Sequence, residues 1–418
     1  MVSCPGACLA LRWAIHMICR KQMTINTKAL ALKGGQPIRE TILPLNSPYL
    51  DDEDERSVSQ TIRSGWIVGD GPKCKEFEEA FADYLGVKYA LLTTSCTSAL
   101  HLAFLALGFS DGQAIIPDYT FTSTGLAPLL TGMTVKLCDV EFDTANIDTR
   151  LIESLITDKT RAIVPVDYAG HPCRIDKINA LAKKHNLVVV HDSAQSCGSK
   201  FHGEYVGRQA LVSCFSFHAT KNLVTGEGGC MVTNDDELAR KAYIMRDKGT
   251  NKREKLLAKG NIGYFEYQSI GNSYVQSNIL GALALSQLKK LDRMNAIRRQ
   301  HAEYLNEGLK HVDGIQLPIV KDYAESNWAI YAIRIMGASV MEVRDAIRAE
   351  GIECNTHYHP LHINAYYRAM ANYQENDFPV SNQVYQSLLR LPMYPQLTHT
   401  DLDETIATVT KVMQAFHQ

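Results

Sequence analysis

The stretch "CFSFHATKNLVTGEGG", residues 214–229, is the most informative part of the chain. In it a single lysine separates a run of strand-forming residues from a glycine-rich segment. Before Lys221, the run "LVSCFSFH" is typical of a strand buried in a sheet. After it, "TGEGG" supplies the glycines that suit tight turns and a close approach of backbone to a ligand. A lysine at this junction is either a surface residue at a strand end or a residue placed to react.

The composition is that of a soluble globular protein, with 45% hydrophobic and 21% charged residues. A length of 418 residues suffices for one large core and a second, smaller domain. The net charge of -2 and the lack of a long basic run argue against nucleic-acid binding. Eleven cysteines without CxxC spacing argue against a zinc site or a disulfide framework. We therefore expect no metal, and a reducing compartment, the cytoplasm.

The N-terminal residues differ in composition from the rest of the chain. The segment "CLALRWAIHMIC", residues 8–19, is apolar but is interrupted by Arg12 and His16. It is too short to span a bilayer, and it lacks the flanking features of a signal peptide. We expect residues 1–35 to be an extension or the product of an upstream start codon, with no membrane association.

The rest of the chain predicts two domains. Within residues 36–275, short apolar runs alternate with segments of helical periodicity, which predicts an α/β domain with a mostly parallel sheet. Residues 276–418 begin with one long helix or two joined ones, over 277–310. Shorter strands and helices follow, which predicts a smaller α+β domain.

Three strand ends in the large domain carry polar side chains. In chain order they hold Ser95, Cys96 and Thr97, then Asp192 and Gln195, then Ser216 and Lys221. Ligands of open α/β sheets gather at the carboxyl ends of the strands, and a helix N-terminus can bind a phosphate. Each feature alone has an ordinary structural explanation, as a strand-end cap, an N-cap or a solvent-facing lysine. Together they supply what pyridoxal phosphate needs: a lysine, a carboxylate for the pyridine nitrogen and a polar phosphate cradle.

Several ordered segments also resemble one known family. They are "SGWIVGDGPKCKEFEEAFADYLG", "TTSCTSALHLAFLALG", "IPDYTFTSTG", "IVPVDYAGHPCRID", "VVVHDSAQSCGSKFHGEYVG", "FSFHATKNLVTGEGG", "GNSYVQSNILGALALSQL" and "HYHPLH". Over roughly residues 40–415 the chain resembles the DegT/DnrJ sugar aminotransferases. This resemblance implies the type I fold of pyridoxal-phosphate-dependent transferases, as in aspartate aminotransferase, with a large, mostly parallel sheet domain and a smaller C-terminal α+β domain.

The resemblance implies a role for individual residues around the cofactor. Lys221 matches the lysine that carries pyridoxal phosphate, and Asp192 matches the acid that pairs with the pyridine nitrogen; both would be catalytic. Gln195 matches the residue at the ring hydroxyl, and Phe121 the aromatic residue stacked on the ring.

Further matches concern the phosphate, the partner subunit and the substrate. Cys96, Thr97 and Ser216 match phosphate ligands; cysteine departs from the usual glycine or alanine, but the backbone amides do the binding. Asn272 matches an asparagine that binds the phosphate of the neighbouring subunit, which implies a homodimer with shared active sites. Trp66 and His357 fall in segments that approach the sugar nucleotide in relatives.

Within the family, the chain is similar to the dTDP-4-amino-4,6-dideoxygalactose transaminases. It carries "SCTSAL", and it has "GNSY" where perosamine synthases usually carry "GYNYR". The similarity implies transfer of an amino group from glutamate to a dTDP-linked 4-keto-6-deoxyhexose, in a ping-pong reaction through pyridoxal and pyridoxamine phosphate. Such an activity would serve lipopolysaccharide or polysaccharide biosynthesis.

Other acceptors and another class of function stay open. A UDP-linked sugar, a 3-keto sugar or an aminocyclitol ketone is an alternative acceptor, and "LALKGGQPIRE" is a phrase met in the aminocyclitol branches. A dehydratase of this fold would carry histidine in place of Lys221. A cofactor-binding regulator without turnover would be expected to carry a DNA-binding domain, and residues 1–40 show no helix-turn-helix pattern.

Overall fold

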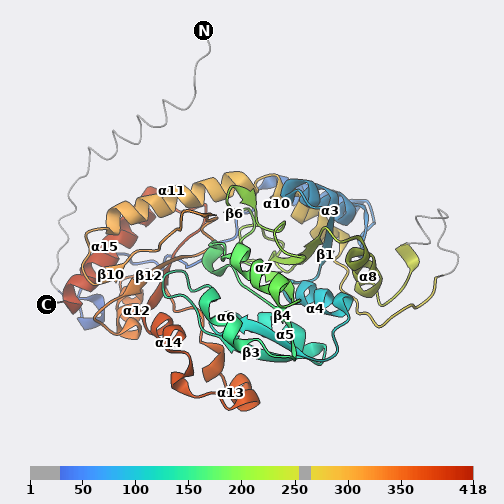
Figure 1. The fold of residues 1–418 in the computed structure, drawn as a ribbon. Helices are drawn as coiled ribbons and strands as arrows, with labels where there is room; N and C mark the ends of the chain where they lie inside the picture. The colour runs from blue at the N-terminus through green and yellow to red at the C-terminus, as the bar shows by residue number, and fades with distance from the viewer. Residues whose placement is uncertain (1–28, 254–264, 418) are drawn as a thin grey trace, which may run out of the picture.

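The computed structural model describes residues 29–253 and 265–417 and confirms the predicted α/β fold (Figure 1). Its centre is a seven-stranded sheet with the order β1-β9-β8-β5-β4-β2-β3, in which only β9 runs antiparallel to its neighbours. The strands are β1 (Tyr89–Thr93), β2 (Gln113–Pro117), β3 (Thr134–Cys138), β4 (Thr160–Ile163), β5 (Val188–Asp192), β8 (Val212–Ser216) and β9 (Gly229–Thr233).

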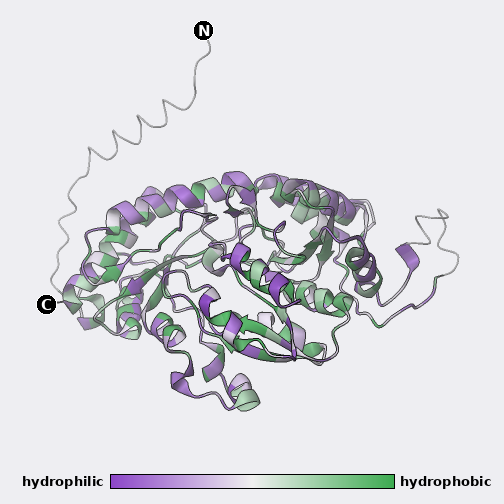
Figure 2. Cartoon of the chain, viewed as in Figure 1, coloured by the Kyte–Doolittle hydropathy of each residue, from purple (hydrophilic) through white to green (hydrophobic). Residues whose placement is uncertain are grey.

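Both faces of this sheet are buried, because side chains along a strand alternate between faces and helices cover each of them. On β2, Ala114 and Ile116 belong to one apolar cluster and Ile115 to another. One face packs on α4 (Cys96–Leu107), α5 (Ser123–Leu130) and α8 (Asp236–Arg246); the other packs on α3 (Pro72–Leu85), α6 (Thr149–Leu155) and α7 (Ile175–Lys184). In Figure 2 the strands of the large sheet are mostly hydrophobic, whereas the helices around them carry both hydrophobic and hydrophilic residues.

The C-terminal part is built on a smaller antiparallel sheet, β10 (Ile315–Gln316), β12 (Tyr331–Ile335) and β13 (Leu388–Leu391). A third, short sheet joins β11 (Ala324–Glu325), β6 (Lys200–Phe201) and β7 (Glu204–Tyr205). The remaining helices are α11 (Leu291–Leu309), α12 (Val340–Ala349), α13 (Ala365–Ala371), α14 (Pro379–Ser387) and α15 (His399–Phe416). An apolar cluster of residues from α11, α12, α15, β12 and β13 fills this part.

The segment predicted as one helix or two is two helices. α10 (Asn278–Leu288) packs against α2 (Asp52–Arg63) and α3, and α11 then runs along the top of Figure 1 into the C-terminal part. Residues at the start of α2 stabilise the break between α10 and α11, because Lys290 donates hydrogen bonds of 2.7 Å to both Asp51 and Asp54. No helix in residues 29–253 and 265–417 is long and apolar enough to cross a membrane.

The beginning of the described chain packs against its end. Leu30 and Leu43, which are 4% and 3% exposed, belong to the C-terminal apolar cluster. Arg39 forms ion pairs with Asp401 and Glu404 of α15. The domain limits at residues 35 and 275 stay a prediction, but this strap, residues 29–43, lies with the C-terminal part rather than with the large sheet.

Candidate active site

Lys221 lies in the turn that follows β8, on the carboxyl side of the large sheet. Its backbone N–H donates to the carbonyl of His218 at 2.9 Å, and the turn closes where Ala219 N–H donates to the carbonyl of Gly226 at 3.0 Å. Gly226 has φ of +81°, a conformation that favours glycine. Burial lowers the pKa of the Lys221 ammonium group, while the charge of Asp192 raises it. The glycine-rich stretch therefore builds a tight turn that holds a half-buried lysine near a carboxylate.

Asp192 ends β5, which lies next to β8 in the parallel part of the sheet, and its side chain is buried. Its Oδ2 accepts a hydrogen bond of 2.7 Å from Thr124 Oγ1, and its Oδ1 accepts one of 3.1 Å from the Ala194 N–H. Burial raises the pKa of this carboxyl group, and these hydrogen bonds and the charge of Lys221 act against that rise. A buried carboxylate held in this way is ready for a cationic partner.

The N-terminus of α4 lies beside these two residues. Ser95 caps the helix by accepting from the Ser98 N–H at 3.0 Å, and the first N–H groups of a helix have no partner within it. A Cβ on Gly229 would come within 2.4 Å of the Cys96 nitrogen, so the start of β9 can approach the helix end only as glycine. Thr97 Oγ1 lies 2.6 Å from the Ser123 hydroxyl. The helix end thus offers N–H groups and hydroxyls to an anion.

Gln195 and Phe121 meet the same tyrosine. Gln195 Oε1 accepts from the Ala169 N–H at 2.8 Å, and its Nε2 donates to the Tyr358 hydroxyl at 3.1 Å. The Phe121 ring is 55% exposed, and its centroid lies 5.8 Å from that of Tyr358. Burial raises the pKa of Tyr358, so its hydroxyl keeps its proton and can donate a hydrogen bond as well as accept the one from Gln195. An exposed aromatic ring beside a fixed amide can cover a flat ligand.

Two more of the expected residues lie near Lys221. Ser216 ends β8, and its Oγ accepts a hydrogen bond of 3.4 Å from the His218 N–H. The backbone carbonyl of His357 accepts a hydrogen bond of 2.5 Å from the Tyr168 hydroxyl. The Nδ1 atom of the His357 ring is buried without a partner among the described residues. Burial lowers the pKa of the His357 imidazole well below its usual range, and the charges of Arg390 and Lys221 lower it further. His357 is therefore a neutral ring at the edge of the site.

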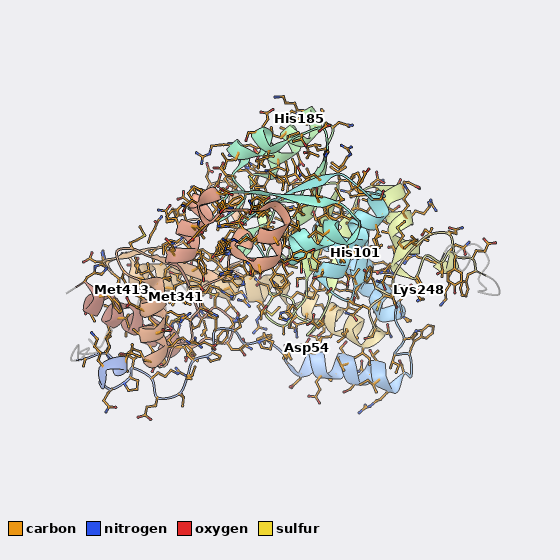
Figure 3. All side chains as sticks on the ribbon, turned by 90° about the horizontal axis from the view of Figure 1, so that it is seen from below. Asp54, His101, His185, Lys248, Met341 and Met413 are labelled. Atoms are coloured by element: carbon orange, nitrogen blue, oxygen red, sulfur yellow. The ribbon has the colours of Figure 1, made fainter. Side chains whose placement is uncertain are left out.

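Asn272 and Trp66 have other surroundings within this chain. The Asn272 side chain bonds to Tyr274 and Ser273, and its backbone carbonyl accepts from Lys248. Tyr274 in turn bonds to His101 in the middle of α4; Figure 3 labels His101 and Lys248. Trp66 is 53% exposed in the loop before α3, where its carbonyl accepts from Asn278. Neither residue contacts Lys221 in a single chain.

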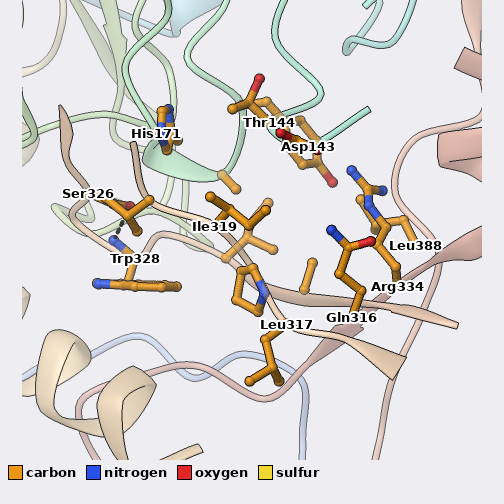
Figure 4. Close-up of a pocket in the computed structure, with 16 residues that line it drawn as sticks. Asp143, Thr144, His171, Gln316, Leu317, Ile319, Ser326, Trp328, Arg334 and Leu388 are labelled. Atoms are coloured by element: carbon orange, nitrogen blue, oxygen red, sulfur yellow. Dashed lines mark hydrogen bonds between the residues drawn. The ribbon is translucent and has the colours of Figure 1, made fainter. Parts of the chain in front are cut away.

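A small pocket lies beside the site, next to the C-terminal part of the chain (Figure 4). Its apolar wall includes Ile319 and Trp328, and its polar end includes Gln316 and Arg334. Tyr168 and Ala169 also line it, and Ala169 is the residue that fixes Gln195. The pocket therefore shares one wall with the site but does not contain Lys221.

The residues present suit pyridoxal phosphate. A buried carboxylate with a raised pKa would be compensated by a protonated pyridine nitrogen, and the N–H groups of α4 would bind a phosphate. A half-buried lysine with a lowered pKa suits covalent attachment, because its amine loses its proton more easily. These three features come from three strand ends, as the size of the cofactor demands.

Solved structures of sugar aminotransferases share this fold. PseC of Helicobacter pylori, an aminotransferase involved in the biosynthesis of pseudoaminic acid, is 30% identical and superposes with a TM-score of 0.84, over 90% of this chain and 100% of its own. The putative sugar aminotransferase Spr1654 of Streptococcus pneumoniae, in its pyridoxamine phosphate form, is 26% identical with a TM-score of 0.84, over 90% and 98%. Fold and relatives define a pyridoxal-phosphate-dependent aminotransferase.

Proteins of similar sequence show which family of aminotransferases the chain belongs to. The spore coat polysaccharide biosynthesis protein SpsC of Bacillus subtilis is 34% identical, over 90% of this chain and 98% of its own. GDP-perosamine synthase of Caulobacter vibrioides is 32% identical, over 88% and 97%. The chain belongs to the DegT/DnrJ/EryC1/StrS aminotransferase family, whose profile matches residues 48–410. It is a sugar aminotransferase of nucleotide-sugar or polysaccharide biosynthesis that uses pyridoxal phosphate.

Three residues of the site were not expected from the sequence. Thr124 supports Asp192, Tyr358 supports Gln195, and Arg390 brings a positive charge close to Lys221. Thr124 and Tyr358 lie in the segments "IPDYTFTSTG" and "HYHPLH", which resemble the family, and Arg390 is a charge within the apolar strand "LLRL", which needs an explanation.

Proposed function

We propose that this enzyme transfers an amino group from glutamate to a nucleotide-linked 4-keto-6-deoxyhexose, with a dTDP-linked sugar favoured. The observation that carries the proposal is the meeting of Lys221 and Asp192 at neighbouring strand ends, each with its pKa shifted by burial toward the neutral form. Groups with perturbed pKa values that interact with each other are typical of catalytic sites.

Each residue then has a definite task. When bound, pyridoxal phosphate supplies a ring that accepts an electron pair from the substrate carbon. The lowered pKa of Lys221 increases the fraction of free amine at neutral pH, so this amine moves the proton to and from that carbon. Asp192, oriented by Thr124, keeps a proton on the ring nitrogen. Phe121 would cover the ring, Gln195 would bind the ring hydroxyl, and the end of α4 with Ser216 would hold the phosphate.

The choice of sugar and donor rests on sequence similarity. "GNSY" in place of "GYNYR" supports the dTDP-sugar subgroup over the perosamine synthases, and Trp66 and His357 are proposed to face the sugar nucleotide. The test is a panel of dTDP-, UDP- and GDP-linked keto-sugars, offered with glutamate or glutamine and followed by mass spectrometry. We expect the amino sugar only from the dTDP-linked 4-keto sugar with glutamate. Amination of only a GDP- or UDP-linked sugar, or with glutamine alone, would overturn this choice.

We further propose that the enzyme works in the cytoplasm as a homodimer in which Asn272 serves the partner's phosphate. Asn272 does not contact Lys221 in its own chain. The adjoining surface exposes apolar side chains, including Val68 at 66% and Ile270 at 82%, which a monomer would leave in water. A two-fold interface over this surface would form two composite sites.

Subunit mixing tests the shared site. A Lys221→Ala protein is allowed to exchange subunits with an Asn272→Ala, Ser216→Ala double variant. If Asn272 acts across the interface, one site of each hybrid carries only the Ser216 change, and activity rises above that of either parent. Exchange without recovery, or a fully active monomer in sedimentation, would disprove the shared site.

A further inference from the structure

A second buried carboxylate lies directly behind the candidate active site. Asp167 follows β4 in the chain, and its N–H donates to the carbonyl of Asp192 on the neighbouring strand at 3.3 Å. Its side chain is fully buried. Among residues 29–253 and 265–417, no lysine or arginine forms an ion pair with it, and only His191 lies within ion-pair distance. Such a group is costly to bury unless hydrogen bonds compensate for its lost hydration.

Three hydrogen bonds supply this compensation. Oδ1 of Asp167 accepts from His191 Nε2 at 2.9 Å and from the Cys173 N–H at 2.8 Å, and Oδ2 accepts from the Ser196 hydroxyl at 2.6 Å. Burial raises the pKa of the Asp167 carboxyl group, but the charge of His191 and these hydrogen bonds bring that pKa below its ordinary value. Apart from Asp167, the His191 ring has only the Cys173 thiol, at 3.7 Å, as a partner among the described residues. The orientation of the ring therefore depends on Asp167.

The two side chains that donate to Asp167 flank the residues expected to hold the cofactor ring. His191 immediately precedes Asp192, and Ser196 immediately follows Gln195. One carboxylate therefore fixes both ends of the short segment that carries the candidate partners of the ring nitrogen and the ring hydroxyl.

The chain that follows Asp167 holds Gln195 from another direction. The carbonyl of Asp167 accepts from the Gly170 N–H at 3.2 Å, and the turn between them presents the Ala169 N–H to Gln195 Oε1 at 2.8 Å. Ala169 has φ of +58°, an uncommon conformation for a residue other than glycine. The hydrogen bond from the Cys173 N–H to the Asp167 carboxylate closes this turn. Asp167 thus supports Gln195 through its side chain and through its own turn.

We propose that Asp167 is a positioning residue, which through His191 and Ser196 holds Asp192 and Gln195 at the separation that the cofactor ring requires. This inference rests on the proposed roles of Asp192 at the ring nitrogen and of Gln195 at the ring hydroxyl. Both atoms belong to one rigid, flat ring, so the two contacts form together only if the two side chains keep a fixed separation. Asp167 lies behind them and would not contact the ring itself.

Binding of cofactor analogues tests this role without turnover. Pyridoxamine phosphate cannot bond covalently to Lys221, and an analogue with carbon in place of the ring nitrogen removes only the contact with Asp192. The parent, freed of cofactor, should bind pyridoxamine phosphate more tightly than this analogue. In Asp167→Asn, which presents N–H groups to donors, the preference should fall about tenfold, since a misplacement of about 1 Å can cost about 100-fold. Inorganic phosphate, which needs only α4 and Ser216, should raise the melting temperature of both proteins equally.

Glu350 offers a matched control in the C-terminal part. It is also a fully buried carboxylate with three hydrogen bonds, from the Ala31 N–H at 2.8 Å, the Ile38 N–H at 3.1 Å and the Lys411 ammonium group at 2.8 Å. Glu350→Gln should lower the melting temperature but keep the parent preference between the two ligands. An equal loss of preference in Glu350→Gln and Asp167→Asn would mean that general destabilisation explains the effect, and would overturn the inference.

Milder variants separate the two side-chain donors. Ser196→Ala should reduce the preference for pyridoxamine phosphate over an analogue that lacks the ring hydroxyl, because Ser196 adjoins Gln195. His191→Leu should reduce the preference for the ring nitrogen. His191→Gln keeps an N–H close to the position of Nε2 and should restore the parent preference. Parent preferences in both Ser196→Ala and His191→Leu would overturn the inference.

The same titrations distinguish a failure of this inference from a failure of the proposed roles. A parent that binds pyridoxamine phosphate and its carbon analogue equally would refute the proposed role of Asp192, and this inference with it. A parent that distinguishes the two ligands, with an unchanged preference in Asp167→Asn, would refute this inference alone.

Discussion

The candidate ligand residues on the two sides of Lys221 differ in how completely the chain satisfies their polar atoms. On the side of the large sheet, Asp192 has Thr124 and Ala194, and Gln195 has Ala169 and Tyr358. On the side of the small sheet, His357 Nδ1 and Arg390 Nε are buried without partners among the described residues. A cofactor that stays bound favours groups fixed in advance, whereas a substrate that comes and goes needs groups left free to bind it.

The largest expected effect comes from Lys221 itself. Lys221→Ala should abolish transamination while the fold and much of the cofactor affinity remain, because the phosphate and ring contacts are separate from the amine. Borohydride reduction of the parent, followed by peptide mapping, should find the cofactor on Lys221. If the reduced cofactor were found on Lys200 or Lys241 instead, the assignment of the active site would be wrong.

Asp192→Asn tests the fixed side most directly. The amide cannot hold a proton on the ring nitrogen, so we expect turnover to fall by orders of magnitude with little change in donor affinity. Turnover above about a tenth of the parent value, a barrier change below ~1.4 kcal/mol, would contradict the pairing role.

The same variant, which should lower turnover, should raise the stability of the cofactor-free protein at neutral pH. Because burial raises the folded-state pKa of Asp192, the folded protein holds this proton more tightly than the unfolded chain does. The contribution of Asp192 to the free energy of unfolding therefore falls as pH rises from its unfolded pKa through its raised folded pKa. At neutral pH, cofactor-free Asp192→Asn should unfold at higher denaturant concentration than the parent, and the difference should shrink in acid.

A smaller effect is expected from the support of Asp192. Thr124→Val removes the 2.7 Å hydrogen bond to Oδ2 and should lower turnover about tenfold, since a hydrogen bond to a charged group contributes roughly 1.5–3 kcal/mol. Thr120→Val is the matched control, because Thr120 bonds to the Thr124 hydroxyl at 2.8 Å and not to the carboxylate. Equal losses in the two variants, measured by steady-state kinetics, would mean that the packing and not the bond matters.

The smallest effect should come from Cys96. Its thiol is buried and its pKa is raised well above the usual value, so it is neither a nucleophile nor an anion. Cys96→Ala should leave cofactor affinity and turnover nearly unchanged, because the helix N–H groups bind the phosphate whatever the side chain. A large loss in a spectroscopic titration with pyridoxal phosphate would show that the thiol itself takes part.

The predictable part of the molecule follows from local pattern. The strands of the large sheet are buried on both faces and read as short apolar runs, so their ends at Asp192 and Ser216 could be found from the sequence. The meeting of those ends then follows from parallel topology.

The remainder depends on contacts between distant segments. Thr124 follows Phe121 by three residues, but no local pattern shows that its hydroxyl bonds to Asp192, and nothing near Arg390 in the sequence places it close to Lys221. The break before α11 is held by Asp51 and Asp54, more than 200 residues away, so periodicity alone could not distinguish one helix from two.

The strap of residues 29–43 has a consequence for synthesis on the ribosome. Its partners are among the last residues to be made: Arg39 and Asp401 are 362 positions apart, and the Lys411 ammonium group bonds to the carbonyl of Gln36 across 375. This strap must therefore wait until the final helix has emerged, while the large sheet, complete by Thr233, can already condense. The contacts between the strap and the C-terminal helix join residues far apart in the sequence, so they should form late and slowly in folding. In pulse-labelled hydrogen exchange, the amide of Leu43 should become protected after those of the large sheet.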